Sequence, residues 1–90
     1  MSVRLPDWND LHDVLLIHET GSLSGAARQA GVSQSTMSRR LEAIEAGGRK
    51  VFERGPGGLG SLTERGRALV AAARQMRASY KANVSLWRRR

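Results

Sequence analysis

The chain has 90 residues, with 15 Lys and Arg against 8 Asp and Glu, so its formal net charge at neutral pH is +7. This length suffices for one compact domain or for a small domain with one projecting element, and so large a basic excess indicates a polyanionic partner. The sequence has no apolar run near the about 20 residues of a membrane span, no secretory signal and no cysteine for disulfides or thiolate metal sites, so we expect a cytoplasmic protein.

The charges are unevenly distributed along the chain. Arg4 is the only basic residue before Arg28, and the acidic residues of this first stretch are Asp7, Asp10, Asp13 and Glu19. From Arg28 onward the chain is strongly basic. A basic surface on a small domain favours nucleic acid as the partner, with an anionic membrane as the second possibility.

Two helices are predicted before the basic part of the chain. Apolar residues at helical spacing indicate a first helix that begins after Asp7, a suitable N-cap, and ends at Gly21. A second, short helix follows, capped by Ser22 or Ser24. It ends at Gly31, where glycine permits a turn with positive φ at low cost.

A third helix, over residues 33–46, carries the chemistry that is most informative about function. Ser33 is its expected N-cap, and Met37, Leu41 and Ile44 form a narrow apolar stripe that faces inward. The remaining faces of its first two turns are polar and basic. Hydrogen-bonding side chains on such a helix are what reading the major groove of DNA requires. The predicted DNA-binding residues of this helix are Ser33, Gln34, Ser35, Thr36, Ser38, Arg39 and Arg40.

The segment 49–62 is predicted to be a β-hairpin that follows the reading helix, which is called a wing. Pro56-Gly57 suits a type II turn between two short strands. Arg49, Lys50 and Arg54 are basic residues that could reach phosphate or the minor groove.

A long helix is predicted over residues 63–88, with Thr63 as its cap. Apolar residues alternate in steps of four and three, as in the seam of a short coiled coil, and Asn83 resembles the polar residue that fixes register. Such a helix would be poorly packed alone, so we expect two copies to pair through it. The predicted dimer interface comprises Leu69, Ala73, Met76, Tyr80, Asn83 and Trp87. The chain thus divides into a DNA-binding domain, 1–62, and a dimerisation helix, 63–90.

Several motifs in the same order resemble the N-terminal winged helix-turn-helix of LysR-type transcriptional regulators. They are the run from Ala26 to Leu41, then Phe52-Glu53-Arg54, then Leu62-Thr63-Glu64-Arg65-Gly66. The resemblance extends from about Leu11 to Val70, and the last helix matches the linker helix of the family. It implies a mainly α fold of three helices and a two-stranded wing, followed by a long dimerising helix.

The resemblance also implies a function, which is sequence-specific binding of double-stranded DNA by a homodimeric bacterial transcriptional regulator. The third helix would enter the major groove, and the wing would contact the flanking backbone or minor groove. Carried over by position, the residues that face the DNA are Gln34, Ser35, Ser38 and Arg39, with Arg54 serving the wing.

The chain departs from the family pattern in four respects. Ser35 stands where the family usually has proline, and Gly47-Gly48 replaces the usual Leu-Gly in a connection that is one residue shorter. The hairpin is one residue longer. The effector domain of the family is missing, so the chain is either a fragment or a natural protein without a sensor. A small-molecule effector would act only through that absent domain.

Other function classes have weaker support. His12 and His18 lie on different faces of the first helix and no acidic or cysteine cluster joins them, so we expect no metal site, no cofactor and no enzymatic activity. The alternative function is a basic amphipathic helix, 63–90, that binds an anionic membrane surface or a protein partner. Single-stranded nucleic acid or RNA is disfavoured because stacking platforms need more aromatic residues. The terminal Arg88-Arg89-Arg90 could contact DNA or form a charged end.

Overall fold

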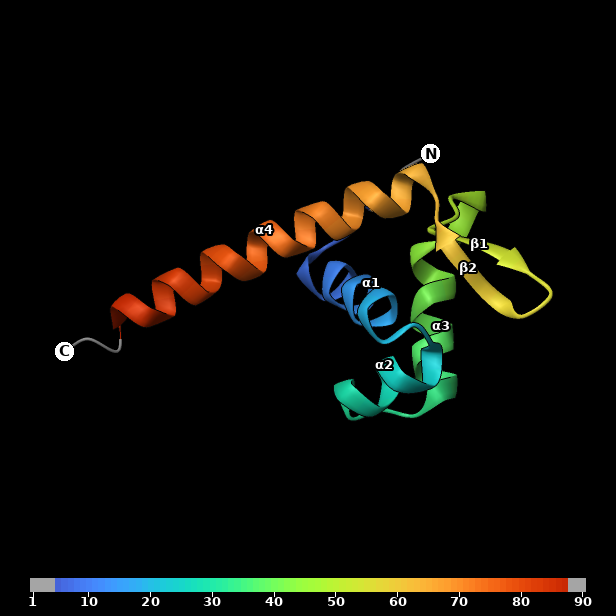
Figure 1. Ribbon diagram of the computed structural model, residues 1–90, viewed down its shortest axis with the longest axis horizontal. Coiled ribbons are helices and arrows are strands. Elements are labelled where there is room, and N and C mark those ends of the chain that lie inside the picture. The colour runs from blue at the N-terminus through green and yellow to red at the C-terminus, as the bar shows by residue number, and fades with distance from the viewer. Residues whose placement is uncertain (1–4, 88–90) are drawn as a thin grey trace.

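The computed structural model describes residues 5–87 of the chain, with side-chain surroundings as far as Val84. It confirms the predicted fold class, a mainly helical body with a two-stranded wing and a long last helix (Figure 1). The elements in chain order are α1 (Trp8–Thr20), α2 (Leu23–Ala30), α3 (Gln34–Ile44), a single turn of 3-10 helix (Ala46–Gly48), β1 (Phe52–Gly55), β2 (Gly58–Leu62) and α4 (Glu64–Trp87).

Side-chain caps start the first two helices where the sequence places them. Asp7 and Asp10 form a reciprocal capping box, in which the Asp10 backbone N–H donates to Asp7 Oδ1 at 3.0 Å and the Asp7 backbone N–H donates to Asp10 Oδ2 at 3.1 Å. Of the two candidates for the cap of α2, the structure selects Ser22 over Ser24. The Ser22 hydroxyl accepts the backbone N–H of Gly25 at 2.9 Å.

The hydrophobic core is built around α1, which packs against α2, α3 and α4. Val14 and Leu15 of α1 are fully buried. The predicted inward stripe of α3 is confirmed, because Met37, Leu41 and Ile44 all belong to the same buried cluster. Burial of this stripe orients the opposite, polar side of α3 toward solvent.

The connection from α3 to the wing differs from the prediction. The third helix ends at Ile44 and not at residue 46, because Gly47 and Gly48 have φ values of 78° and 79°, which a right-handed helix cannot accommodate. Only glycine adopts this left-handed region at low cost. The polypeptide therefore reverses within a few residues and reaches the first strand at Phe52.

The wing is confirmed as an antiparallel hairpin, but its turn is not of the predicted type. A type II turn needs a positive φ at Gly57, whereas the positive φ, 101°, occurs at Gly58. The register pairs Phe52 with Leu62 and Arg54 with Leu59, which leaves an irregularity between the two pairs. The paired segment starts at Phe52, three residues after the predicted start at Arg49.

The last helix, α4, belongs partly to the core and partly to the projecting arm seen in Figure 1. Val70 and Ala73 are buried in the main cluster, with Ala73 entirely inaccessible. Ala73 is therefore a core residue of the chain, which corrects its place in the predicted dimer seam. Trp87 ends the helix, but its side chain lies outside the described part, as do Arg88, Arg89 and Arg90. Within residues 5–87, each helix is too short or too polar to span a membrane.

The junction between β2 and α4 generates a stability prediction. A Cβ atom on Gly66 would overlap the backbone carbonyl oxygen of Val51, whereas one on Gly57 at the wing tip would meet no atom within 4 Å. We expect Gly66→Ala to lower the free energy of unfolding by about 2 kcal/mol, as overpacking does, and Gly57→Ala to leave it nearly unchanged. Urea unfolding of both variants measures this, and equal midpoints for Gly66→Ala and wild type would contradict the close approach.

Candidate nucleic-acid interface

The polar side of α3 presents most of the predicted DNA-binding side chains to solvent. Gln34, Ser35 and Arg39 are exposed, whereas Ser38 is half-buried at the edge of the helix. These side chains lie in the first two turns of α3, and they face solvent because Met37, Leu41 and Ile44 turn the apolar stripe into the core. The exposed surface combines an amide, hydroxyls and a guanidinium on one short helix, which suits hydrogen bonding to base edges.

The N-terminus of α3 is capped by Ser33, as predicted. The Ser33 Oγ accepts the backbone N–H of Thr36 at 3.1 Å and donates to Thr36 Oγ1 at 2.9 Å. Ser35 Oγ lies 3.2 Å from the same Ser33 oxygen. Ser33 and Thr36 are thus engaged with each other, so what this end of the helix offers a ligand is its positive dipole end and the exposed Ser35 hydroxyl.

The two adjacent arginines of α3 lie in different surroundings. Arg40 Nη1 lies 3.4 Å from Asp13 Oδ1 of α1, and the Asp13 side chain is only 8% exposed. Burial raises the pKa of Asp13 above its ordinary value, although the neighbouring Arg40 and His12 act to lower it. Arg39 forms no ion pair with any described residue. Arg39 is therefore the freer of the two cations for an external partner.

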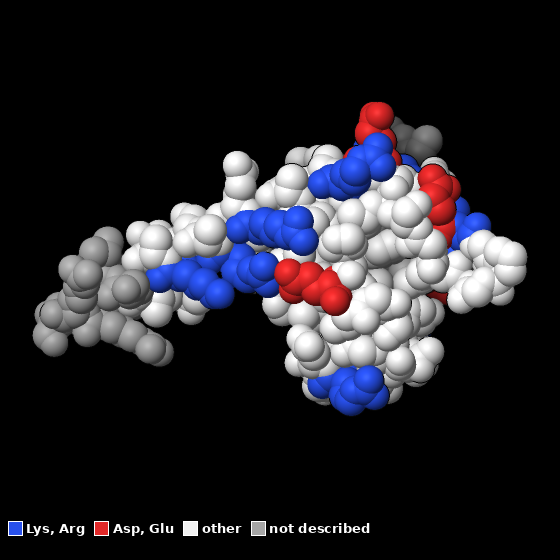
Figure 2. Space-filling view, in the orientation of Figure 1, with Lys and Arg blue, Asp and Glu red and all other residues white. Residues whose placement is uncertain are grey.

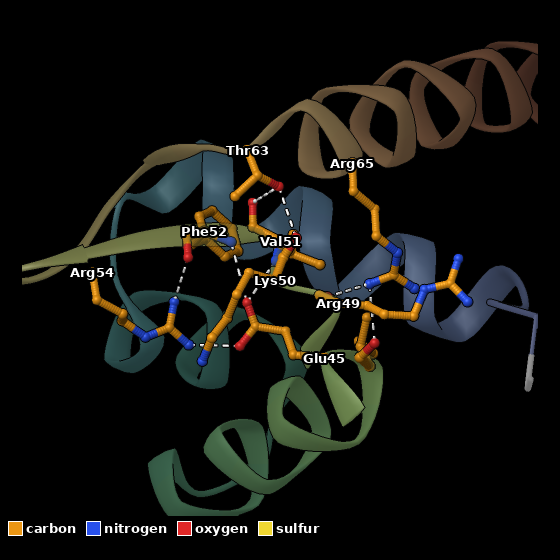
Figure 3. Close-up of polar contacts among 9 residues, drawn as sticks. Glu45, Arg49, Lys50, Val51, Phe52, Arg54, Thr63 and Arg65 are labelled. Atoms are coloured by element: carbon orange, nitrogen blue, oxygen red, sulfur yellow. Dashed lines mark hydrogen bonds and ion pairs between the residues drawn. The ribbon is translucent and has the colours of Figure 1, made fainter. Parts of the chain in front are cut away.

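A buried carboxylate at the end of α3 anchors the wing (Figure 3). Glu45 Oε2 accepts the backbone N–H of Val51 at 2.7 Å and that of Phe52 at 3.2 Å, and its Oε1 lies 2.6 Å from Arg54 Nη2. The other terminal nitrogen of Arg54, Nη1, donates to the Phe52 carbonyl at 2.8 Å. Although burial alone would raise the pKa of Glu45, the two backbone N–H groups and Arg54 hold it below the ordinary value.

This arrangement gives Arg54 a task that the sequence did not indicate. Its guanidinium points toward Glu45 and the wing backbone, with 42% of the side chain exposed. Arg54 therefore anchors the hairpin from within, and a contact between Arg54 and DNA stays a prediction. Arg49 and Lys50, at the foot of the wing, are also exposed, and no hydrogen bond from their side chains to a described residue is found.

The structural role of Arg65, in the first turn of α4, is not apparent from the sequence. Its Nη1 donates to the carbonyl of Ile44, the last residue of α3, at 3.1 Å and to the carbonyl of Arg49 at 2.7 Å (Figure 3). Burial and the nearby Arg49 lower the pKa of Arg65. In the sequence it stands among several arginines of one basic helix, and no local pattern distinguishes it from them.

A further part of the basic surface lies along α4. Figure 2 shows Lys and Arg side chains gathered along α4 on the face in view. Arg67, Arg74 and Lys81 of α4 are exposed, whereas Arg77 is bound by Glu19 of α1 through two contacts of 3.2 and 3.0 Å. The hydrogen bond to Arg77 lowers the pKa of Glu19. This pair ties the middle of α4 to the C-terminal end of α1.

Comparison with known proteins places this geometry among regulators. Residues 8–67 match the family model described as bacterial regulatory helix-turn-helix protein, lysR family. The chain is 46% identical over 46 residues to an uncharacterized HTH-type transcriptional regulator of Mycobacterium tuberculosis. That match covers 51% of this chain and 15% of the relative, so the relative extends far beyond the part that is similar.

Two solved structures are similar over almost the whole chain. The crystal structure of VV2_1132, a LysR family transcriptional regulator, is 32% identical with a TM-score of 0.69, over 88% of this chain and 27% of that one. The crystal structure of the CbnR_DBD–DNA complex is 28% identical with a TM-score of 0.71, over 94% of this chain and 100% of that one. The second protein is thus similar in extent as well as in fold.

The Glu45 anchor generates a prediction about pH. Since the pKa of Glu45 is lower in the folded chain than in the unfolded chain, its stabilising contribution is present above the ordinary glutamate pKa and is lost as the pH falls through the folded-state value. We expect Glu45→Gln to lower the free energy of unfolding by about 2 kcal/mol at neutral pH. The variant should also lose stability less steeply on acidification than wild type.

Urea unfolding between about pH 3 and about pH 7 measures both effects, over the range in which carboxylates titrate. Glu42→Gln is the matched control, because Glu42 is an exposed glutamate in the last turn of α3, close in sequence to Glu45. A Glu45→Gln variant that retains the acid sensitivity of wild type would show that another carboxylate is responsible.

Proposed function

The chain belongs to the lysR family of bacterial regulatory helix-turn-helix proteins, and from that membership we propose that it binds double-stranded DNA sequence-specifically, as the DNA-binding domain of a transcriptional regulator. The observation that carries this proposal is the polar side of α3, on which Gln34 and Arg39 are exposed and Arg39 forms no ion pair with any described residue. Such a chain acts by binding and has no catalytic role. It works in the bacterial cytoplasm, and any effector domain lies outside these residues.

In the proposed complex α3 enters the major groove by its N-terminal turns. Gln34 can pair through two hydrogen bonds with an adenine edge, and Arg39 can do the same with guanine. Ser38 stands one residue before Arg39 and is half-buried, so it suits a contact at the groove wall. These three side chains would supply the sequence preference.

Phosphate contacts would supply most of the affinity. The positive end of α3 and the exposed Ser35 suit one phosphate, and Arg49 and Lys50 at the foot of the wing suit another. We assign Arg40 a smaller share, because Asp13 already holds its guanidinium. Binding of this kind weakens steeply as salt concentration rises.

We also propose that the chain forms a homodimer through α4. Trp8, Met76 and Tyr80 line a shallow apolar depression between the start of α1 and the middle of α4, and their exposed fractions are 37%, 42% and 67%. Large apolar side chains exposed together mark an interaction surface. A second copy covering it would set two α3 helices on the half-sites of a two-fold-related DNA site.

Arg39 provides the first test of this function. Selection from random DNA should enrich a two-fold-related sequence with wild type. Arg39→Ala should lose about 1–3 kcal/mol of discrimination at one base position. Arg74→Ala removes an equal charge from exposed α4 and should leave the base preference intact. If wild type enriches no sequence, the proposed function is wrong.

The dimer surface provides the second test. Tyr80→Asp should raise the dimer dissociation constant at least about tenfold, because it removes a large apolar contact and places a charge in the interface. Ala78→Asp is the control, since Ala78 is exposed on the same helix. It lies two residues before Tyr80, and this spacing places it on a nearly opposite face of the helix. Sedimentation velocity measures both variants. Equal dimerisation by Tyr80→Asp and wild type would exclude this surface.

A further inference from the structure

We infer that Arg65 is a positioning residue, which couples the reading helix α3 to the helix α4 and thereby fixes the spacing between the two half-sites that a dimer recognises. This inference rests on the proposed function. Its starting point is one guanidinium that bridges α4 to Ile44 at the end of α3 and to Arg49 in the connection that follows.

The Arg65 bridge forms at the C-terminal end of α3, where the backbone carbonyls have no hydrogen-bond donors within the helix. The carbonyls in the last turn of a helix lack intrahelical partners and carry the negative end of the helix dipole. A guanidinium is suited to that end, since it is cationic and has several donors in a rigid plane. The connection that follows contains Gly47 and Gly48, which bring no side chains with which to brace it.

Two neighbours of Arg65 hold the other end of the same connection, Thr63 just before α4 and Gly66 in its first turn. Thr63 donates from its backbone N–H to the Val51 carbonyl at 2.9 Å and from Oγ1 to the Lys50 carbonyl at 2.8 Å. Gly66 lies directly against the Val51 carbonyl. The start of α4 therefore grips both the end of α3 and the start of the wing, and Arg65 is the member of this group that bonds to α3.

The Arg65 bridge affects the spacing between the two reading helices of a dimer, and it does not affect the affinity of one helix for one half-site. In a dimer joined through α4, the angle between α4 and α3 determines how far apart the two reading helices lie. Half-sites recur about one helical turn apart, so a small change in that angle changes the preferred spacing. A bridge between α4 and the end of α3 narrows the range of angles.

The experiment measures binding of the full chain to DNA that carries two selected half-sites at a series of spacings, and to DNA that carries one. For wild type we expect one preferred spacing. Arg65→Ala should bind that spacing about tenfold more weakly, which is a typical coupling between two sites, and should bind adjacent spacings almost equally well. Its affinity for a single half-site and its base preference should match those of wild type.

Two further variants distinguish loss of the bridge between α3 and α4 from loss of a positive charge and from loss of folding. Arg74→Ala removes an equal charge from α4 and should retain the wild-type spacing preference. Arg65→Lys keeps the charge but lacks the planar guanidinium, so it should broaden the preference for half-site spacing less than Arg65→Ala does. If circular dichroism shows that Arg65→Ala is unfolded, the spacing preference of Arg65→Lys is the test of the inference.

The outcomes distinguish this inference from the proposed function. If wild type selects paired half-sites and the Arg65 variants keep its spacing preference, the inference fails and the function stands. An equal loss of affinity for single and paired half-sites would also overturn it, because Arg65 would then act on binding itself. If wild type selects no sequence, both fail.

Discussion

The Glu45 carboxylate holds the start of the wing through two backbone N–H groups and the Arg54 guanidinium. Glu45 is buried, with only 7% of the residue exposed. A buried charge is costly unless it is paired and hydrogen-bonded, and here both oxygens have partners. Within residues 5–87, those partners come from Val51, Phe52 and Arg54 alone. The carboxylate can thus be buried only when α3 ends beside it and the first strand begins at Phe52, which makes the wing and the reading helix parts of one unit.

The same constraint explains how the chain tolerates a short connection after α3. Gly47 and Gly48 take left-handed backbone conformations and let the polypeptide reverse at once, but glycines contribute no side-chain contacts of their own. The hydrogen bonds that brace this turn come from its flanks. Glu45 supplies them from the end of α3, and Thr63 and Arg65 supply them from the start of α4. The bracing residues and the glycines therefore depend on each other.

Local signals in the sequence predicted much of the fold. The caps Asp7 and Ser33 and the inward stripe of α3 depend on residues within a few positions of one another, so spacing alone identifies them. The exposed polar side of α3 follows directly from that stripe. The residues that face DNA within it remain a prediction, because they depend on a ligand that spacing does not describe.

The features that the sequence did not reveal depend on partners distant along the chain. Arg40 faces Asp13 across 27 positions and Arg65 faces Ile44 across 21, and neither separation has a period from which to infer the contact. The predicted turn type of the wing is wrong, because the positive φ could fall on any of several adjacent glycines and it falls on Gly58. Ala73 fits a coiled-coil seam by spacing, but the same small side chain also fits against α1.

This dual use of α4 bears on the choice between the two functions that the sequence left open. The boundary between residues 1–62 and 63–90 falls between β2 and α4, yet the core continues across it through Val70 and Ala73. Those buried residues are part of the apolar face that a surface-bound membrane helix would need to expose. With that face committed to α1, what α4 offers outside is a basic side and the apolar group of Met76 and Tyr80 beside Trp8. A helix so divided is better suited to holding two reading domains at a fixed angle than to lying on a bilayer.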